Sequence, residues 1–493
     1  MREAYLAIDF GTSNVHVTLI DAETTQAIAG AQKKYGWYYP AQNVVELHIE
    51  ETWEASEWAV GEVLRQMPQD VQIIAISFSY FGDSITPVDA QGNALYGMMP
   101  GFCGRSQREV QTIADVIGAD EYGRITGNTL STLSTPSKIM WLRNNEPEIF
   151  KKTAAFYSNQ QYVMRKLGLG DVQDRTMAAR KLAIDVKADC WSAPILDLAG
   201  VTEKQMGAEI VESATVVGKI DHYGNVKLPG MIPVTVGCHD VSASLLAAGV
   251  TVDKPDTIGV LMGTYEQMGY FSDEFVDGCN DFVDSLIFSC CYSSPFKNKY
   301  TVMDAFPTAG ALLEWFCKNI LNDPHADIGK MIAETDLSCE GTLHVLPYVE
   351  NFHGAITGMS LSTTTKDIFR GILESLAYQF VSCVDYIRST RKEPFTKLHF
   401  GGGGSRTDKL LQLRADLIGA PLGRMENVEL PTLGACMLAG LGNGFYTSVE
   451  DAHAHMHNEV RYFEPRADEG ERYRNRMKEY RALSAEYLGR DRK

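Results

Sequence analysis

One short pattern, an apolar strand that ends in a Gly-Thr turn, occurs twice in this chain, about half its length apart. Residues 6–13 read LAIDFGTS, and residues 258–264 read IGVLMGT. Such a turn gathers backbone N–H groups and a hydroxyl at one point, and glycine lets a ligand approach the backbone closely. Each copy alone is also consistent with an ordinary hairpin turn. Because the copies begin the two halves of the chain, we predict two turns that hold opposite sides of a polyphosphate.

The two copies differ at one chemically important position. Asp9 of the first copy corresponds to Leu261 of the second, so only the first turn carries a carboxylate that suits a metal ion. This asymmetry favours a nucleotide site over a repeat that serves only the fold.

Length and charge restrict the class of protein. A chain of 493 residues is too long for one hydrophobic core, so two large domains are expected. Its 45 basic and 63 acidic side chains give a net charge of −18, which argues against nucleic acid or a membrane as the main partner. An anionic small molecule is not excluded, because backbone N–H groups and Mg²⁺ can overcome the overall charge locally.

The sequence contains no pattern typical of a targeting or membrane-spanning segment. Asp9 interrupts the first apolar run, and no stretch approaches the roughly 20 apolar residues that span a bilayer. Ten cysteines are scattered without a C-x-x-C pair, which is typical of reduced, buried thiols. We therefore expect a cytoplasmic protein.

Hydrophobic periodicity predicts an α/β chain whose halves meet near residues 251–256, a charged stretch that contains Pro255. The predicted domains are residues 1–250 and residues 251–493, the second ending in a helical tail from about residue 446. Individual elements predicted are a strand over 71–78 and helices over 106–126, 136–167 and 365–388.

Four consecutive glycines, residues 401–404, stand between a predicted strand and a predicted helix and are followed by Ser405. They leave an open backbone surface for a flat or anionic ligand, and the helix N-terminus adds a partial positive charge. A flexible linker is the alternative, but the apolar elements on both sides argue against it.

Asp240 occupies the point where a buried strand over 231–237 is expected to give way to a helix. A side chain at such a point can enter a cleft, although aspartate there also serves as a helix cap. His239 precedes it. Because neighbours on a strand face opposite sides, the pattern does not imply a His–Asp pair.

Taken in chain order, these segments resemble the FGGY carbohydrate kinases, which share the actin-like ATPase fold. The resemblance runs from residue 5 to about residue 444, with seven segments in the family's order. Residues 9–13 are similar to the first phosphate motif, 135–142 to the first signature, 171–191 to the sugar-cleft stretch and 237–249 to the catalytic segment. Residues 263–264 are similar to the second phosphate motif, 354–374 to the second signature and 402–419 to the adenosine motif.

The resemblance implies two actin-like (ribonuclease H-like) domains with a catalytic cleft between them. It also implies transfer of the γ-phosphoryl group of ATP to a hydroxyl of a sugar, polyol or sugar acid. Asp240 would be the general base, and Asp9 with Asp240 would hold Mg²⁺. The residues that would bind ATP are Gly11, Thr12, Ser13, Gly263, Thr264, Gly402, Gly403, Gly404 and Ser405. A homodimer is a further expectation from the resemblance.

Departures from the family's pattern concentrate at the sugar site. Many members have Trp-x-Asp-x-Arg where residues 101–105 read GFCGR, and xylulose kinases have Gln-Met-His where residues 79–84 read SYFGDS. A xylulose kinase of the usual type is therefore not expected, although a ketose or pentulose-type substrate is favoured. Asp83 and Arg105 are the predicted sugar contacts, with a loop salt bridge as the alternative. The altered segment also leaves a second function open, that of a catalytically degenerate nucleotide sensor with the actin fold.

Overall fold

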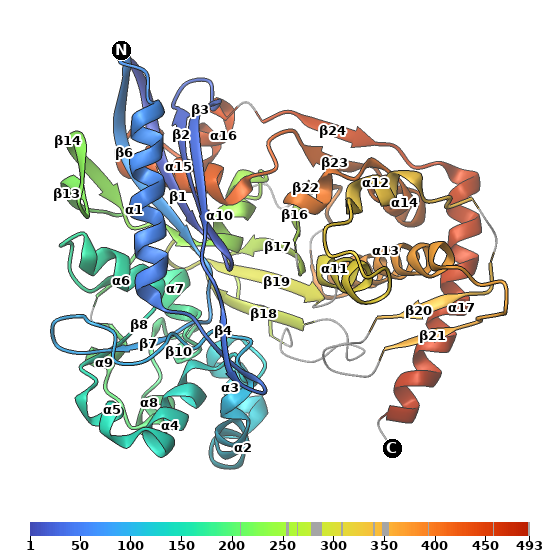
Figure 1. Ribbon diagram of the computed structural model, residues 1–493, viewed down its shortest axis with the longest axis horizontal. Helices are drawn as coiled ribbons and strands as arrows, with labels where there is room; N and C mark the ends of the chain where they lie inside the picture. The colour runs from blue at the N-terminus through green and yellow to red at the C-terminus, as the bar shows by residue number, and fades with distance from the viewer. Residues whose placement is uncertain are drawn as a thin grey trace.

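Two large sheets, one in each half of the chain, form the framework of the protein (Figure 1). Within the described residues each sheet has seven strands. We call the part built on the first sheet (strands within residues 2–239) the N-terminal lobe and the part built on the second (strands within residues 257–463) the C-terminal lobe. The computed structural model describes residues 1–207, 209–252, 256–263, 265–277, 288–306, 309–338, 341–347, 354–392, 394–456 and 458–491.

The first sheet is mixed, with β1 at its centre. It runs in the order β13, β14, β6, β1, β2, β3, and β15 pairs with β6. β1 is antiparallel to β2 and parallel to β6, which confirms the strand predicted over 71–78. The bounds are β1 (Arg2–Phe10), β2 (Asn14–Asp21), β3 (Ala27–Lys34), β6 (Val71–Tyr80), β13 (Val216–Tyr223), β14 (Val226–Thr235) and β15 (Cys238–His239).

The second sheet repeats this arrangement. It runs in the order β18, β19, β17, β16, β22, β23, β24, and β16 is antiparallel to β17 and parallel to β22. β16 therefore stands to its neighbours as β1 does, so the echo seen in the sequence is a repeat of topology. The bounds are β16 (Thr257–Met262), β17 (Glu266–Ser272), β18 (Phe288–Ser293), β19 (Tyr300–Phe306), β22 (Lys397–Gly401), β23 (Leu422–Met425) and β24 (Val460–Phe463).

Helices cover both faces of the first sheet. Side chains alternate along a strand, so Leu6 of β1 faces one side and Ala7 the other. Leu6 belongs to a buried cluster with α1 (Ile49–Gln66), and Ala7 to the cluster that contains α15 (Leu430–Gly442). Among the described residues, no helix combines the length and the apolar character needed to cross a lipid bilayer.

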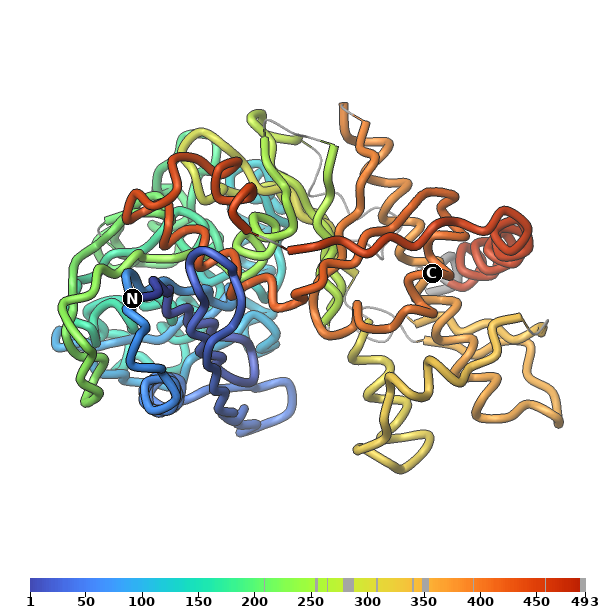
Figure 2. Tube along the Cα trace, turned by 90° about the horizontal axis from the view of Figure 1, so that it is seen from above, coloured from blue at the N-terminus to red at the C-terminus, as the bar shows by residue number. Residues whose placement is uncertain are grey.

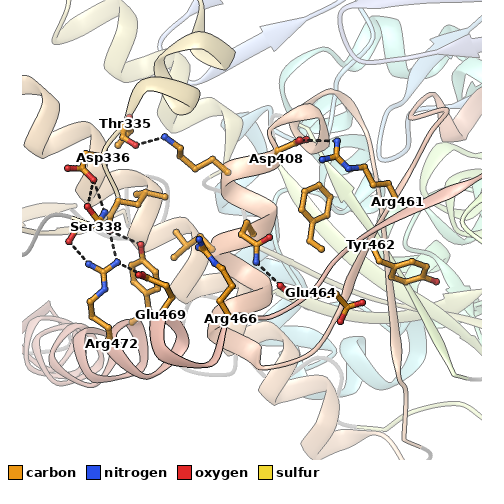
Figure 3. A pocket seen from close by; sticks show the side chains of 16 residues that line it. Thr335, Asp336, Ser338, Asp408, Arg461, Tyr462, Glu464, Arg466, Glu469 and Arg472 are labelled. Carbon is orange, nitrogen blue, oxygen red and sulfur yellow. Dashed lines mark hydrogen bonds and ion pairs between the residues drawn. The ribbon is translucent and has the colours of Figure 1, made fainter.

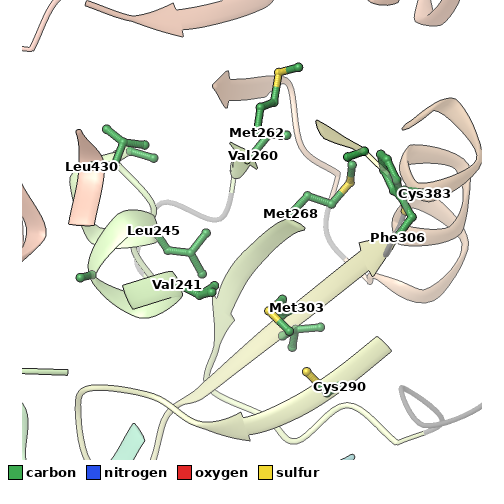
Figure 4. Packing of buried hydrophobic residues seen from close by; sticks show 14 of the residues in the cluster. Val241, Leu245, Val260, Met262, Met268, Cys290, Met303, Phe306, Cys383 and Leu430 are labelled. Atoms are coloured by element: carbon green, nitrogen blue, oxygen red, sulfur yellow. The ribbon is translucent and has the colours of Figure 1, made fainter. Parts of the chain in front are cut away.

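The two lobes interlock through two helices that follow equivalent strands. α10 (Asp240–Ala247) comes from the N-terminal half, but its Leu245 lies against β16 and β17 of the second sheet (Figure 4). In return, α15 packs on β1 and β6, and Figure 2 shows this orange-red stretch among the segments of the N-terminal lobe. The two helices cross so closely that a Cβ atom on Gly434 would lie 1.9 Å from the carbonyl oxygen of Ala243. The predicted division at 251–256 stays a prediction, and its residues 253–255 lie outside the described residues.

Two of the three predicted helices are interrupted in the structure. The helix predicted over 365–388 is confirmed as α13 (Thr365–Thr390). Gly118, with a φ of 91°, separates α2 from α3 within 106–126. The segment 136–167 contains a strand, β8, which pairs with β7. These pieces are α2 (Gln107–Val116), α3 (Ala119–Thr126), α4 (Thr135–Asn145), α5 (Pro147–Lys152), β8 (Ala155–Tyr157) and α6 (Asn159–Lys166).

The smaller elements lie mainly around the rims of the two lobes (Figure 1). They are β4 (Tyr38–Ala41), β5 (Val44–Glu46), β7 (Thr86–Val88), η1 (Gly104–Ser106), β9 (Val172–Asp174), α7 (Arg175–Ala179), β10 (Ile184–Asp185), β11 (Cys190–Trp191), α8 (Ala193–Ala199), α9 (Glu203–Met206), β12 (Glu209–Val211), α11 (Gly310–Asn319), α12 (Ile328–Glu334), β20 (His344–Leu346), β21 (Ala355–Thr357), η2 (Gly403–Arg406) and α14 (Asp408–Ile418).

The sequence predicts a helical C-terminal tail, but the tail also contains a strand. β24 extends the second sheet between α16 (Val449–His455) and α17 (Ala467–Asp491). α17 is held by cations that reach carboxylate or carbonyl oxygens (Figure 3). Arg466 pairs with Asp416 at 2.6 Å, and Arg472 donates to the carbonyl oxygen of Leu337 at 2.9 Å. These contacts explain why a charged helix docks on this lobe.

Asp304 is a carboxyl group buried inside the second sheet, on β19. Burial raises its pKa from 3.8 to about 7, because the ionised form is poorly solvated there. The pKa of Asp304 is higher in the folded protein than in the unfolded chain. Its neutral carboxyl group therefore contributes its full stabilisation of the fold below pH 3.8. This contribution is lost as the pH rises through about 7.

Asparagine at position 304 stays neutral at every pH. We therefore expect the thermal midpoint of Asp304→Asn, relative to the wild type, to rise by several degrees between about pH 5 and about pH 8. Thermal unfolding at the two pH values measures this. A difference between the two proteins that does not change with pH would contradict a raised pKa for Asp304.

Candidate active site

The first predicted phosphate turn joins β1 to β2. Asp9 is the last residue but one of β1 and lies beside Ser79 of β6, whose hydroxyl donates to its carboxylate at 2.5 Å. The N–H of Gly11 donates to the carbonyl oxygen of Asn14 at 3.0 Å and closes the turn. Its tip is formed by Thr12 and Ser13, both exposed.

Tyr35 supports this turn and was not found from the sequence. Its buried hydroxyl lies at the carbonyl oxygens of Gly11 and Asn14, the second at 3.1 Å. Burial raises the pKa of Tyr35, and the charges of Asp9 and Asp240 raise it further. The charges of both carboxylates therefore act on the pKa of the same tyrosine, so Asp9 and Asp240 lie in one site. No local pattern marks Tyr35, because its partners lie more than 20 residues away in the chain.

Asp240 is the first residue of α10, directly after the short strand β15. Its Oδ1 accepts the N–H of Val241 at 2.7 Å and lies 3.2 Å from Nε2 of His239. The structure thus brings the two side chains into contact, which the sequence pattern did not imply. Strand alternation ends at His239, where the backbone turns into the helix, so the two neighbouring side chains approach each other.

Both carboxylates of this site resist ionisation. Burial is the main cause that raises the pKa of Asp240 to about 7, and the charge of Asp9 adds to it. Burial likewise raises the pKa of Asp9 to about 6, although the hydrogen bond from Ser79 opposes the shift. Two half-buried carboxylates close together fit a divalent cation, and their oxygen atoms suit Mg²⁺.

Asp83 lies next to this pair and forms an ion pair with a buried arginine. Its Oδ2 accepts from Arg180 at 2.6 Å, and Arg180 also donates to Oδ1 of Asn128 at 2.9 Å. Oδ1 of Asp83 is buried and has no hydrogen-bond partner among the described residues. The charges of Asp83 and Arg180 act on the pKa of Asp240 in opposite directions, so both lie near the candidate base.

Arg180 was missed in the sequence, although a signal was present. Arg180 and Lys181 are two adjacent cations between Ala179 and Leu182, in an otherwise apolar stretch. Such a pair inside a core needs partners, and both side chains are buried.

Arg105 is held by neighbouring side chains and by the backbone. Its side chain, 2% exposed, pairs with Glu46 at 2.8 Å and donates to the carbonyl oxygen of Val45 at 3.1 Å. Its guanidinium also lies over the rings of Tyr96 and Trp141. These contacts correspond to the loop salt bridge rather than to a sugar contact, because the guanidinium is held by the protein itself.

The departure at residue 101 also has a physical reason. A Cβ atom on Gly101 would lie 2.7 Å from Leu133 and 2.9 Å from Cβ of Asp83. The tryptophan that many kinases of the resembled family carry there has no room in this structure.

The second phosphate turn and the glycine loop meet at the end of β16. Gly263 is exposed, and its N–H donates to the carbonyl oxygen of Tyr265 at 3.0 Å, whereas the predicted Thr264 lies outside the described residues. Gly402, with a φ of 83°, lies against Met262, and a Cβ atom on it would approach the Met262 carbonyl oxygen to 2.6 Å. Only glycine allows this close approach.

The other residues of the glycine loop either line a cavity or stabilise the loop itself. Gly403 and Gly404 line a cavity, whereas Ser405 is fully buried and its hydroxyl donates to the carbonyl oxygen of Gly402 at 2.7 Å. The structure therefore places Ser405 inside the turn, where its hydroxyl stabilises the loop, and its predicted contact with ATP stays a prediction.

That cavity, of about 930 Å³, lies between the glycine loop and helices α11 and α12. Gly263 and Gly403 line one side of it, and Leu313, Ile328 and Ile332 provide apolar surface. A flat ring and an anionic group could thus be held together, at an apolar wall and at open backbone. The sequence did not reveal α11 and α12 as walls, because their apolar residues look like ordinary core positions.

Comparison with known families identifies the chain. The family model described as "FGGY family of carbohydrate kinases, N-terminal domain" matches residues 4–247, and the one described as the C-terminal domain of the same family matches residues 284–442. The chain belongs to the FGGY family of carbohydrate kinases. It is accordingly a phosphotransferase that acts on an alcohol group of a sugar, with ATP as the phosphoryl donor.

Individual FGGY kinases are similar to this chain along almost its whole length. A xylulose kinase of Bacillus subtilis (strain 168) is 24% identical over 97% of this chain and 96% of its own. A glycerol kinase of Lactobacillus acidophilus is 25% identical over 96% of each chain. The solved structure of a gluconate kinase from Lactobacillus acidophilus is 19% identical, with a TM-score of 0.86 over 99% of this chain and 100% of its own.

The structural likeness confirms the expected FGGY fold of two actin-like domains. The names of these relatives refer to three different substrates, so the substrate has to be argued from the site itself. Within that fold the structure brings Asp9, Asp83 and Asp240 together, and separately brings Gly263 together with Gly402 and Gly403.

Proposed function

We propose that this kinase phosphorylates a hydroxyl group of a ketose, with a pentulose-type sugar favoured, and that Asp240 is its general base. The observation that carries the proposal is the asymmetric environment of the Asp240 carboxylate. Oδ1 accepts the N–H of Val241 and lies 3.2 Å from Nε2 of His239, whereas Oδ2 receives no hydrogen bond from the described residues, and the side chain is 29% exposed. One oxygen is thus fixed and the other is available to a substrate.

The free oxygen is suited to accept the proton of an attacking hydroxyl group. As that proton moves to Oδ2, the substrate oxygen bonds to the γ phosphorus of ATP and the bond to the β–γ bridging oxygen breaks, so ADP leaves. Such a transfer depends mainly on positioning and charge neutralisation, because the phosphoryl group passes through a loose transition state. A base with a pKa near 7 matches this role at neutral pH.

Asp9 and Asp240 are the residues that would hold Mg²⁺, directly or through water. When bound, the ion neutralises charge on the phosphate oxygens. The hydroxyl of Ser79 orients the carboxylate of Asp9, which would keep its other oxygen in place for the ion.

The nucleotide is proposed to lie across both lobes. Gly11, Thr12 and Ser13 on one side and Gly263 with Thr264 on the other would hold its phosphates. The adenosine would occupy the cavity of about 930 Å³ beside Gly403 and Gly404. Its apolar wall from α11 and α12 fits a purine ring, which supports this placement.

Asp83 is the proposed sugar contact in this site. Its buried Oδ1 lacks a donor among the described residues, and buried acceptors are rarely left unpaired. A substrate hydroxyl would supply the missing hydrogen bond, while Arg180 keeps the carboxylate in place. The contacts of Arg105 do not support the same role for that residue.

A panel of substrates tests the proposed function. Purified protein with Mg²⁺ and ATP is given pentuloses, hexuloses, polyols and aldonic acids in turn, and ADP release is followed with a coupled assay. We expect sugar-dependent ADP with one or more ketoses. Binding of an ATP analogue without sugar-dependent ADP from any compound would instead favour the nucleotide sensor.

A further inference from the structure

The candidate base receives support from the other lobe. β18 is an edge strand of the second sheet, yet it lies against the N-terminal lobe, where the N–H of Cys291 donates to the carbonyl oxygen of Gly127 at 2.8 Å. The next residue, Tyr292, is fully buried, and its ring lies 5.1 Å from the guanidinium of Arg180. A C-terminal side chain thus enters the interior of the N-terminal site.

The Tyr292 hydroxyl and the Asp240 carboxylate are joined through one imidazole ring. The hydroxyl lies 3.2 Å from Nδ1 of His239, and Nε2 of His239 lies 3.2 Å from Oδ1 of Asp240. A lone pair on Nε2 would repel the carboxylate oxygen that lies 3.2 Å away, so the hydrogen of a neutral His239 ring belongs on Nε2. In a neutral ring Nδ1 is then an acceptor, and the Tyr292 hydroxyl donates to it.

The ring of His239 is also confined by its surroundings. The backbone N–H of His239 donates to the hydroxyl of Thr176 at 2.8 Å. Gly82 lies directly against the ring, since a Cβ atom there would come within 2.8 Å of Nε2. The ring position fixes Nδ1 as the nitrogen that faces Tyr292. The hydrogen bond from the tyrosine hydroxyl then requires that Nδ1 carry no hydrogen.

We propose that Tyr292 and His239 are positioning residues for Asp240. Tyr292 fixes the tautomer of His239 with hydrogen on Nε2, and His239 then holds Oδ1 of Asp240. Oδ2 is thereby left to face the substrate hydroxyl. This inference rests on the proposed role of Asp240 as the base. It adds that the C-terminal lobe contributes a side chain to the alignment of that base.

Kinetics of Tyr292→Phe test the effect on the reaction. This variant keeps the ring and removes the hydroxyl, so we expect kcat to fall about tenfold with KM values for ATP and sugar nearly unchanged, since one hydrogen bond that orients the base is lost. The matched control is Tyr223→Phe, which removes another buried, hydrogen-bonded hydroxyl far from the site. Its kcat should stay within about twofold of the wild type. An unchanged kcat in Tyr292→Phe would overturn the proposal.

A spectroscopic readout decides the tautomer without any substrate. The protein is labelled with nitrogen-15 histidine, and the His239 signal in a two-bond proton–nitrogen correlation spectrum is assigned by its loss in His239→Gln. We expect hydrogen on Nε2 in the wild type and a mixture of tautomers in Tyr292→Phe. Hydrogen on Nδ1 in the wild type, or the same tautomer in both proteins, would overturn the proposal.

The two failures can be told apart. If Asp240→Asn kept full activity, the proposed base would be wrong, and the claim that Tyr292 aligns a base would fall with it. The tautomer spectra would still report whether Tyr292 sets the ring of His239. If Asp240→Asn were inactive and the spectra contradicted the expected tautomer, the base would stand and only this inference would fail.

Discussion

Replacement of Asp240 by asparagine is expected to lower kcat about a thousandfold while the affinity for an ATP analogue stays within about threefold of the wild type. The amide keeps the shape of the side chain but is a far weaker proton acceptor. The coupled ADP assay with the best substrate of the panel measures kcat, and calorimetric titration with a non-hydrolysable ATP analogue measures the affinity.

The same variant separates catalysis from folding. Because burial raises the pKa of Asp240, a neutral amide fits the site at least as well as the ionised carboxylate, and the thermal midpoint should not fall. Asp304→Asn serves as the matched control, since it removes a buried carboxyl group of similar pKa outside the proposed site. Its kcat should equal that of the wild type. A parallel loss of kcat in both variants would remove the special role of Asp240.

The second large effect is expected at the floor of the cavity, where Glu266 and Arg414 form a buried ion pair. The guanidinium donates to both carboxylate oxygens, at 2.6 and 2.7 Å, and both side chains are at most 2% exposed. Glu266→Ala leaves the arginine buried without its partner. We therefore expect the free energy of unfolding to fall by about 3 to 5 kcal/mol, measured by denaturant unfolding.

A double variant provides the control for this prediction. Replacing both partners with apolar residues of similar size, Glu266→Leu with Arg414→Met, removes the charge together with its need for a partner. Most of the lost stability should return. Equal losses in the single and double variants would show that the pair contributes through its shape and not through its charge.

This pair also bears on nucleotide binding. Arg414 contacts the sulfur of Met262 at 3.5 Å, and Met262 directly precedes the turn at Gly263. We expect Glu266→Ala to weaken binding of the ATP analogue, because the floor beneath this turn is disturbed.

The fold could be predicted from the sequence where local chemistry was sufficient. The repeated strand and turn at Gly11 and Gly263 corresponds to the repeated pairing of β1 and β16. Strong apolar periodicity gave β6 and α13 almost to their ends. In these segments the spacing of apolar residues fits either a strand or a helix but not both, so the local pattern determines the structure.

Other features depend on contacts that the local sequence does not contain. The strand β8 forms because it pairs with β7, far away in the chain, and a helical pattern in 136–167 cannot reveal that. Likewise, Tyr35, Arg180 and Tyr292 gain their roles only when distant segments meet. The ion pair of Arg105 with Glu46 could be named only as a loop salt bridge without a partner, because Glu46 lies almost 60 residues earlier.

Main-chain hydrogen bonds join the N-terminal lobe to β18 and to the residues that directly follow it. Besides the bond from Cys291 to Gly127, the N–H of Ser213 donates to the carbonyl oxygen of Pro295 at 3.0 Å. Any rotation of one lobe against the other that keeps these main-chain bonds must therefore have its axis close to them.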